Sequence, residues 1–247
     1  MTVDPLALRD DLRRADDRLL ATVAALTPES LAAPSLLPDW SRSHVLSHLA
    51  RNADSLNNLL TWARTGVETP AYPSPAARAA GIEAGAGRPL GAQLDDLRDT
   101  SARFLAAVDT MPTEAWAFTY RPQHSRPQPG SAAYVVWRRL REVEVHHVDL
   151  GLAYGTKDWP AAFTARLLRE LVIDRPRSTG DDPVVGIVAT DGTSWQNGSS
   201  GQIGAGEPAV TVSGPAYELA GWLAGRTSGS SLTVSPHGPL PTLSAWM

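Results

Sequence analysis

Cysteine is absent from this 247-residue chain. Disulfides, thiolate metal ligands and cysteine nucleophiles are therefore excluded. A metal ion could be bound only through histidine or carboxylate side chains. Chemistry that needs a thiol would have to take it from a small molecule.

Other features are also missing. No apolar run approaches the ~20 residues that cross a bilayer, and the first residues are too charged for a secretory signal peptide. The net charge of −4 gives no reason to expect a nucleic-acid partner. The sequence contains no phosphate loop, dinucleotide fingerprint or nucleophile elbow. We therefore expect a cytoplasmic protein that binds neither membranes nor nucleic acids.

The first part of the chain has helical periodicity. Hydrophobic residues recur at three- and four-residue steps in long segments that are separated by proline and glycine. Four long helices are predicted over residues 5–26, 39–64, 90–111 and 131–154. Four such helices in succession favour a helical bundle.

Two proline-rich stretches interrupt this pattern. Residues 66–91 are rich in Pro, Gly and Ala, and Ser74-Pro75 could begin a short helix through Arg78 within them. Residues 121–130 are predicted to form a loop. Long connections inside compact proteins are often functional.

The sequence pattern changes after Gly155, from long helical segments to a mixture of helices and strands. One more helix is predicted over residues 159–175, followed by strands at 184–190, 193–196, 209–213 and 231–235 and a helix at 216–224. Asp191-Gly192 lies between two β-type runs, which is a hairpin signal. We expect two domains: a metal-binding helical bundle over 1–155, and a small α+β domain over 156–247 that contributes to the substrate pocket.

Glu142 and His146 carry the first chemical signal. Four-residue spacing in a helix places both side chains on one face, where they could bind one metal ion. A surface hydrogen-bonded pair is the common alternative. Asp149, three residues further on, could orient an imidazole ligand.

His48 is the best candidate for a third ligand, because it lies in the middle of an apolar helical segment. Taken alone, it would be interpreted as a core histidine. His44 is the rival, but it falls in the first helical turn. Two His and one Glu leave coordination positions free, as catalytic rather than structural zinc sites do.

Arginines could bind carboxylates by paired hydrogen bonds. Arg78 in the long connection and Arg226 after the last helix are candidates, although a solvated surface charge is the usual role of each. Arg138, Arg139 and Arg141 are predicted to form a solvated helix face with local ion pairs.

Four segments together resemble the mycothiol-dependent maleylpyruvate isomerase family. Two of them, residues 35–50 (SLLPDWSRSHVLSHLA) and 141–151 (REVEVHHVDLG), resemble its metal-binding motifs. The loop at residues 65–78 is more similar to the isomerases than to the wider superfamily, and residues 212–226 resemble the C-terminal domain of this family. The metal motif is shared by many thiol-dependent transferases. Arg78 and Arg226 therefore indicate the isomerase family more specifically than the metal motif does.

The resemblance implies a DinB-like four-helix bundle followed by a small α+β domain. It implies zinc, or another divalent metal, bound by His48, Glu142 and His146, with Arg78, Asp149 and Arg226 in the pocket. Arg78 and Arg226 would hold the substrate carboxylates and stabilise enolate charge.

The implied reaction uses the thiol of mycothiol, held as a thiolate at the metal. The thiolate adds to the cis double bond of maleylpyruvate, the resulting single bond rotates, and elimination gives fumarylpyruvate. The resemblance implies that this reaction belongs to gentisate breakdown. Two alternatives stay open: a mycothiol S-transferase that acts on another electrophile, and a non-catalytic metal-binding member of the family.

Overall fold

The computed structural model describes residues 4–121, 130–174, 184–196, 208, 210–243 and 246. The chain divides into two compact units, Met1–Gly151 and Leu152–Met247, which are described separately. No helix in the described part of the chain has the length and apolar character required to cross a membrane.

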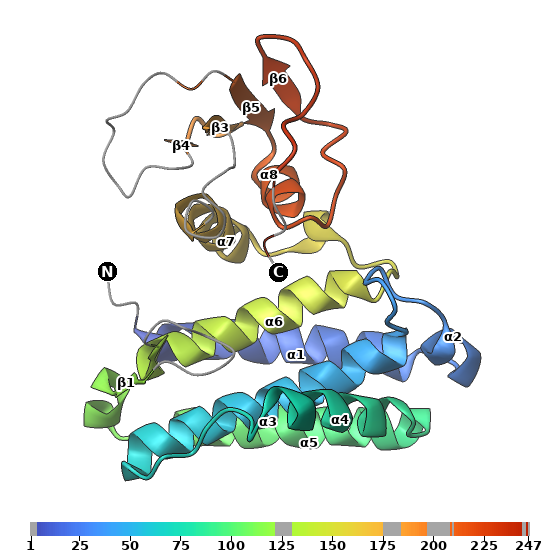
Figure 1. Cartoon of the computed structure of the whole chain (residues 1–247), viewed down its shortest axis with the longest axis vertical. Helices are drawn as coiled ribbons and strands as arrows, with labels where there is room; N and C mark the ends of the chain where they lie inside the picture. Colours follow the sequence, from blue (N-terminus) through green and yellow to red (C-terminus); the bar gives the residue numbers. More distant parts are fainter. Residues whose placement is uncertain are drawn as a thin grey trace. The chain divides into compact units, whose positions relative to one another are not determined.

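The first unit is a bundle of four long helices with two shorter ones (Figure 1). The long helices are α1 (Arg9–Ala24), α3 (Arg42–Thr65), α5 (Leu90–Asp109) and α6 (Val135–Asp149). The short helices are α2 (Pro28–Ala32) and α4 (Pro75–Ala86). Helix α3 packs against α4, α5 and α6, and α1 packs against α5 and α6. The predicted four-helix bundle is therefore confirmed.

Shorter elements join these helices. The described part of this unit contains the 3-10 helices η1 (Pro5–Leu8), η2 (Thr113–Ala117) and η3 (Ala132–Tyr134) and the short strands β1 (Thr119–Tyr120) and β2 (Gly130–Ser131). Strands β1 and β2 pair antiparallel. Residues 122–129 of the predicted 121–130 loop lie outside the described residues.

Local sequence signals explain the helix limits. Ser41 caps the start of α3, and Gly66 ends it with a φ of 72°, a left-handed conformation that glycine adopts without strain. Ser74 caps α4, and Pro75 occupies its first position. These caps fix where His48 on α3 and Arg78 on α4 enter the bundle.

The sequence prediction for Arg139 is wrong. Its side chain is fully buried (0% exposed), whereas a solvated helix face was expected for Arg138, Arg139 and Arg141. The guanidinium donates hydrogen bonds to the Leu49 carbonyl (2.7 Å) and the Asn52 side-chain oxygen (3.1 Å). It also donates to the Ser101 hydroxyl at 3.2 Å and lies 3.7 Å from Asp16. Polar groups from three other helices therefore stabilise the buried charge.

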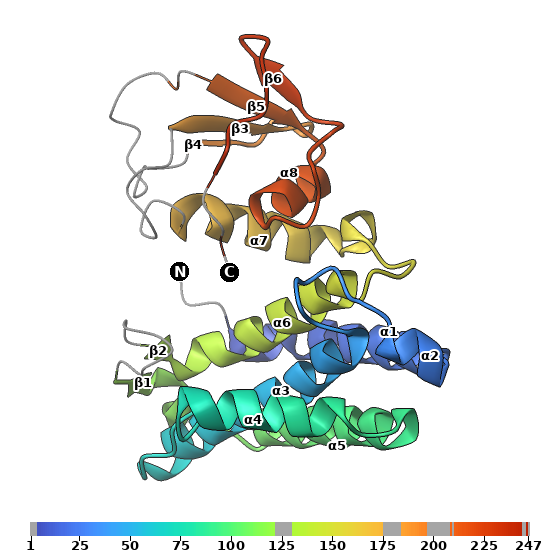
Figure 2. The ribbon, with the colours of Figure 1, turned by 45° about the vertical axis from the view of Figure 1, so that its right-hand side comes forward.

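The second unit is α+β, as predicted. Its elements are η4 (Thr156–Asp158), α7 (Ala161–Asp174), β3 (Val185–Ala189), β4 (Ser194–Gln196), β5 (Val210–Gly214), α8 (Ala216–Leu223) and β6 (Thr233–Ser235). The sheet order is β4-β3-β5-β6, with β3 and β5 parallel and the other pairs antiparallel. Helices α7 and α8 pack together on one face of this sheet (Figure 2).

The predicted Asp191-Gly192 hairpin is present between β3 and β4. Gly192 has a φ of 86°, and the Asp191 carboxylate accepts a hydrogen bond from the Thr193 amide at 2.9 Å. This is the turn chemistry that makes Asp-Gly a hairpin signal.

Candidate metal centre

The two histidines of helix α3 have different positions and contacts. His44 completes the N-terminal capping box, because its Nδ1 accepts a hydrogen bond from the Ser41 amide at 3.2 Å. His48 lies one turn later and is buried, with 5% of its surface exposed. The structure thus keeps His44 at the helix end and directs His48 into the bundle.

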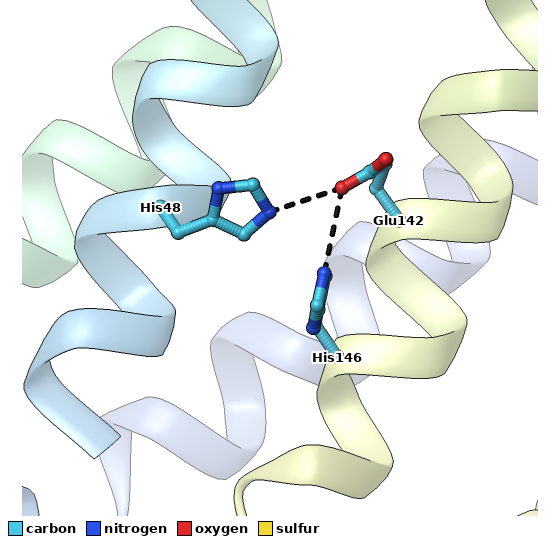
Figure 3. A group of neighbouring side chains, drawn as sticks. All are labelled: His48, Glu142 and His146. Atoms are coloured by element: carbon cyan, nitrogen blue, oxygen red, sulfur yellow. Dashed lines mark hydrogen bonds and ion pairs between the residues drawn. The ribbon is translucent and has the colours of Figure 1, made fainter. Parts of the chain in front are cut away.

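His48, Glu142 and His146 converge on one point, and we refer to them as the ligand cluster (Figure 3). Each residue offers one donor atom, and these atoms all lie within 4.8 Å of one another. Glu142 Oε2 is 3.0 Å from His48 Nε2 and 3.5 Å from His146 Nε2. Two helices, α3 and α6, therefore bring together the three side chains that the sequence singled out.

The donor set and its spacing fit a divalent metal ion. Ligands bound at about 2.1 Å in a tetrahedral arrangement lie about 3.4 Å apart. The two distances from Glu142 bracket that separation. Two imidazoles and one carboxylate would leave a coordination position open to an outside ligand.

Asp149 orients one of these imidazoles. Its carboxylate is buried and lies 2.8 Å from Nδ1 of His146. A proton on Nδ1 is held by this hydrogen bond, and the ring orientation directs Nε2 toward Glu142. Carboxylates bonded in this way to metal-ligating histidines fix the tautomer and ring orientation.

Burial and mutual contacts set the ionisation of the cluster. Burial opposes the charge on Glu142, but hydrogen bonds and charges from His146 and His48 outweigh it and hold the Glu142 pKa well below its usual value. Burial likewise opposes protonation of His146, but Asp149 and Glu142 raise its pKa. Burial lowers the pKa of His48, assisted by the charges of His146 and Arg78. The metal-free cluster thus combines an anionic carboxylate with an imidazole whose protonated form is stabilised by that carboxylate and by Asp149.

Arg78 reaches the same cluster from α4. Its Nη2 lies 3.3 Å from Nδ1 of His48, and its guanidinium stands over the Tyr72 ring at 5.9 Å from the centroid. Helix α4 is fastened to α3 by the Ser47 hydroxyl, which donates to the Ile82 carbonyl at 2.7 Å. The contact between Gly85 and Ser47 is so close that a Cβ on Gly85 would lie 2.2 Å from the Ser47 oxygen.

Arg226 belongs to the second unit and follows α8. Its Nη1 donates a hydrogen bond to the Ala224 carbonyl at 2.7 Å, and its amide bonds to the Gly221 carbonyl at 2.8 Å. Its contribution to the pocket stays a prediction, as does the role of each residue in binding metal or substrate.

The fold and the ligand cluster define a helical-bundle protein with a candidate divalent-metal site and an additional α+β domain. Residues 12–151 match the family model of the mycothiol maleylpyruvate isomerase N-terminal domain. Residues 158–245 match that of the MDMPI C-terminal domain, the second domain of the same isomerases. The chain therefore belongs to the mycothiol maleylpyruvate isomerase family.

Two solved structures resemble the whole chain. One is the crystal structure of the mycothiol-dependent maleylpyruvate isomerase, and the other is that of a histidine-to-alanine mutant of it. Each has 26% sequence identity and a TM-score of 0.87, over 99% of this chain and 98% of the other. A comparison with curated proteins found no match.

Proposed function

We propose that this protein is a metal-dependent cis–trans isomerase that converts maleylpyruvate to fumarylpyruvate with mycothiol as its thiol cofactor. The observation that carries the proposal is the convergence of three donor atoms within 4.8 Å in a chain that belongs to this family. The proposal includes zinc as the metal, a cytoplasmic location and a place in gentisate breakdown.

His48, Glu142 and His146 would hold the metal ion. When bound, the ion lowers the pKa of a thiol and keeps it as the nucleophilic thiolate. The absence of cysteine from the chain agrees with a thiol supplied by a small molecule.

The remaining residues would orient the ligands and the substrate. Asp149 would keep His146 in the tautomer that presents Nε2 to the metal, which its 2.8 Å contact with Nδ1 supports. Arg78 and Arg226 would bind the substrate carboxylates and stabilise the negative charge that develops on the substrate oxygens. The second domain would thereby contribute to the substrate pocket.

An isomerisation assay tests the proposal. Metal-loaded protein should convert maleylpyruvate to fumarylpyruvate only when mycothiol is present, and a chelator should abolish the conversion. Absence of isomerisation by metal-loaded protein with mycothiol would contradict the proposal. Thiol transfer to another electrophile in that same preparation would then indicate a mycothiol S-transferase.

A further inference from the structure

Tyr72 lies between α3 and α4, in a segment that is anchored to α3. The Asn58 side-chain amide donates to the carbonyls of Pro70 and Ala71, each at 3.4 Å. The tyrosine as a whole is half-buried, but its hydroxyl oxygen is buried. The phenol therefore points inward from a segment that is itself held in place.

The hydroxyl of Tyr72 makes no hydrogen bond of acceptable geometry with any residue that the structure describes. The Ser55 hydroxyl and the Arg78 side chain approach it and lower its pKa, but neither contact has the geometry of a full hydrogen bond. The Ser55 hydroxyl donates its own proton to the Asn52 carbonyl at 2.8 Å, so toward Tyr72 it is only a weak acceptor. Buried polar groups in folded proteins nearly always have a partner, and an exception needs an explanation.

Tyr120 shows the usual arrangement. It is also buried, and its hydroxyl donates to the Leu59 carbonyl at 2.9 Å. The bundle can therefore satisfy a buried phenol with a backbone acceptor. It does not do so for Tyr72, which lies beside the candidate site.

Tyr72 is connected to the candidate metal site through Arg78. The Arg78 guanidinium stands over its ring and also approaches His48 at 3.3 Å. Burial raises the pKa of Tyr72, and the charge of Glu142 adds to this effect, whereas Ser55 and Arg78 oppose it. The phenol therefore stays protonated near neutral pH and can donate a hydrogen bond next to a fixed positive charge.

We propose that the Tyr72 hydroxyl is a substrate-binding group that donates a hydrogen bond to an anionic oxygen, carboxylate or enolate, of the molecule held by Arg78. This inference rests on the proposed function for the identity of that molecule. The neutral Tyr72 hydroxyl and the charged Arg78 guanidinium would bind the same anionic oxygen and together stabilise its negative charge. The donor without a full hydrogen bond to any described residue would gain one in the complex.

The substitution Tyr72→Phe tests this role, with Tyr120→Phe as the matched control. Tyr72→Phe retains the ring beneath Arg78 and removes only a hydroxyl that has no partner. Its thermal midpoint should equal or exceed that of the wild type, and kcat/KM for maleylpyruvate should fall about tenfold to a hundredfold. Tyr120→Phe should lower the midpoint by about 2–4 °C and leave kcat/KM unchanged.

A second measurement separates this inference from the proposed function. Binding of maleate, a cis dicarboxylate, to metal-loaded and thiol-free protein requires no turnover. We expect Tyr72→Phe to bind maleate about tenfold or more weakly than the wild type, even if maleylpyruvate proves not to be the substrate. Equal maleate binding by the two proteins, or none by the wild type, would overturn the role of Tyr72. So would a Tyr72→Phe variant that is less stable but kinetically normal.

Discussion

Helices α3 and α6 carry two buried charged groupings that use their cations differently. The ligand cluster is one. The other is the arginine cluster, which consists of Arg139, Asp16, Asn52 and Ser101. Arg139 precedes Glu142 by three residues on α6, and Asn52 follows His48 by four on α3, so the two groupings are neighbours along the same helix faces.

The arginine cluster contains its own cation, a guanidinium that donates to a carbonyl, an amide oxygen and a hydroxyl. The ligand cluster instead gathers two imidazoles and a carboxylate whose donor atoms face one another. A proton or a metal ion held between these donor atoms would offset the charge of the carboxylate. We infer that one cluster serves folding and the other serves binding, and five predictions test the distinction.

The largest effect is expected from His48→Ala. This variant should lose the bound metal, and isomerisation should fall at least about a thousandfold, because a catalytic metal contributes several kcal/mol. The metal-free variant loses the His48–Glu142 hydrogen bond and should be about 1–3 kcal/mol less stable than the metal-free wild type. His44→Ala is the control and should retain the metal, since His44 serves the helix cap. The metal content and the isomerisation rate of both variants are to be measured. Full metal retention by His48→Ala would contradict the ligand assignment.

Arg139→Met should show the opposite pattern. Removal of the cation leaves Asp16 buried without its charged partner, which should lower the free energy of unfolding by about 3–5 kcal/mol. Folded protein should still bind one metal ion per chain. Arg98→Met, which breaks an exposed pair with Asp95, should cost less than about 1 kcal/mol in the same denaturant titration. Equal losses in the two variants would refute a structural role for the arginine cluster.

Asp149→Asn tests the support of His146. The introduced side-chain amide accepts a hydrogen bond from Nδ1–H of His146 less strongly than the carboxylate does. Metal affinity should therefore fall about tenfold to a hundredfold. Competition with a chelator of known affinity measures the change. An unchanged affinity would show that Asp149 does not orient the ligand.

Gly85→Ala tests the placement of Arg78. The new methyl group would displace Ser47 or push α4 away from α3, at a cost of about 1–3 kcal/mol. The KM for maleylpyruvate should rise while the metal content stays unchanged. Gly81→Ala on the same helix is the control, because its Cβ would make only an ordinary contact, 3.5 Å from Arg51. Identical KM values for the two variants would argue against α4 as the element that positions Arg78.

The smallest effect concerns pH. In the metal-free protein the pKa of His146 is raised above 6.5, because Asp149 and Glu142 outweigh burial. The proton on His146 therefore stabilises the metal-free fold fully when the pH lies below 6.5, the usual pKa of histidine. This stabilisation is lost as the pH rises through the raised pKa of His146. A metal ion must displace that proton, so metal affinity should rise with pH by up to about tenfold per unit over this range. Calorimetry in buffers of different ionisation enthalpy should detect the released proton, and pH-independent affinity would contradict this coupling.

Much of this architecture could be predicted from sequence. Hydrophobic periodicity and caps located the four long helices, and four-residue spacing placed Glu142 and His146 on one face. The approach of Arg78 to His48 could not be derived in this way, because it depends on the path of residues 66–74 and on the close contact at Gly85. Only the expectation that Arg78 lies in the pocket was available beforehand, and it came from the family resemblance.

The failures also have physical causes. Arg139 lies among other arginines, a pattern typical of a solvated face, and its burial depends on Asp16, Asn52 and Ser101 from distant segments. Tyr72 carried no local signal beyond an aromatic residue in a proline-rich stretch. Its significance lies in a buried hydroxyl that makes no full hydrogen bond within the described part of the chain, which only the three-dimensional arrangement reveals.

The most direct test of the central claim is anomalous scattering from crystals of the metal-loaded protein, measured at the absorption edge of the bound metal. We predict one peak in the bundle, about 2.0–2.2 Å from Nε2 of His48, Nε2 of His146 and a carboxylate oxygen of Glu142. A peak at His44 instead, or none among these three side chains, would contradict the account.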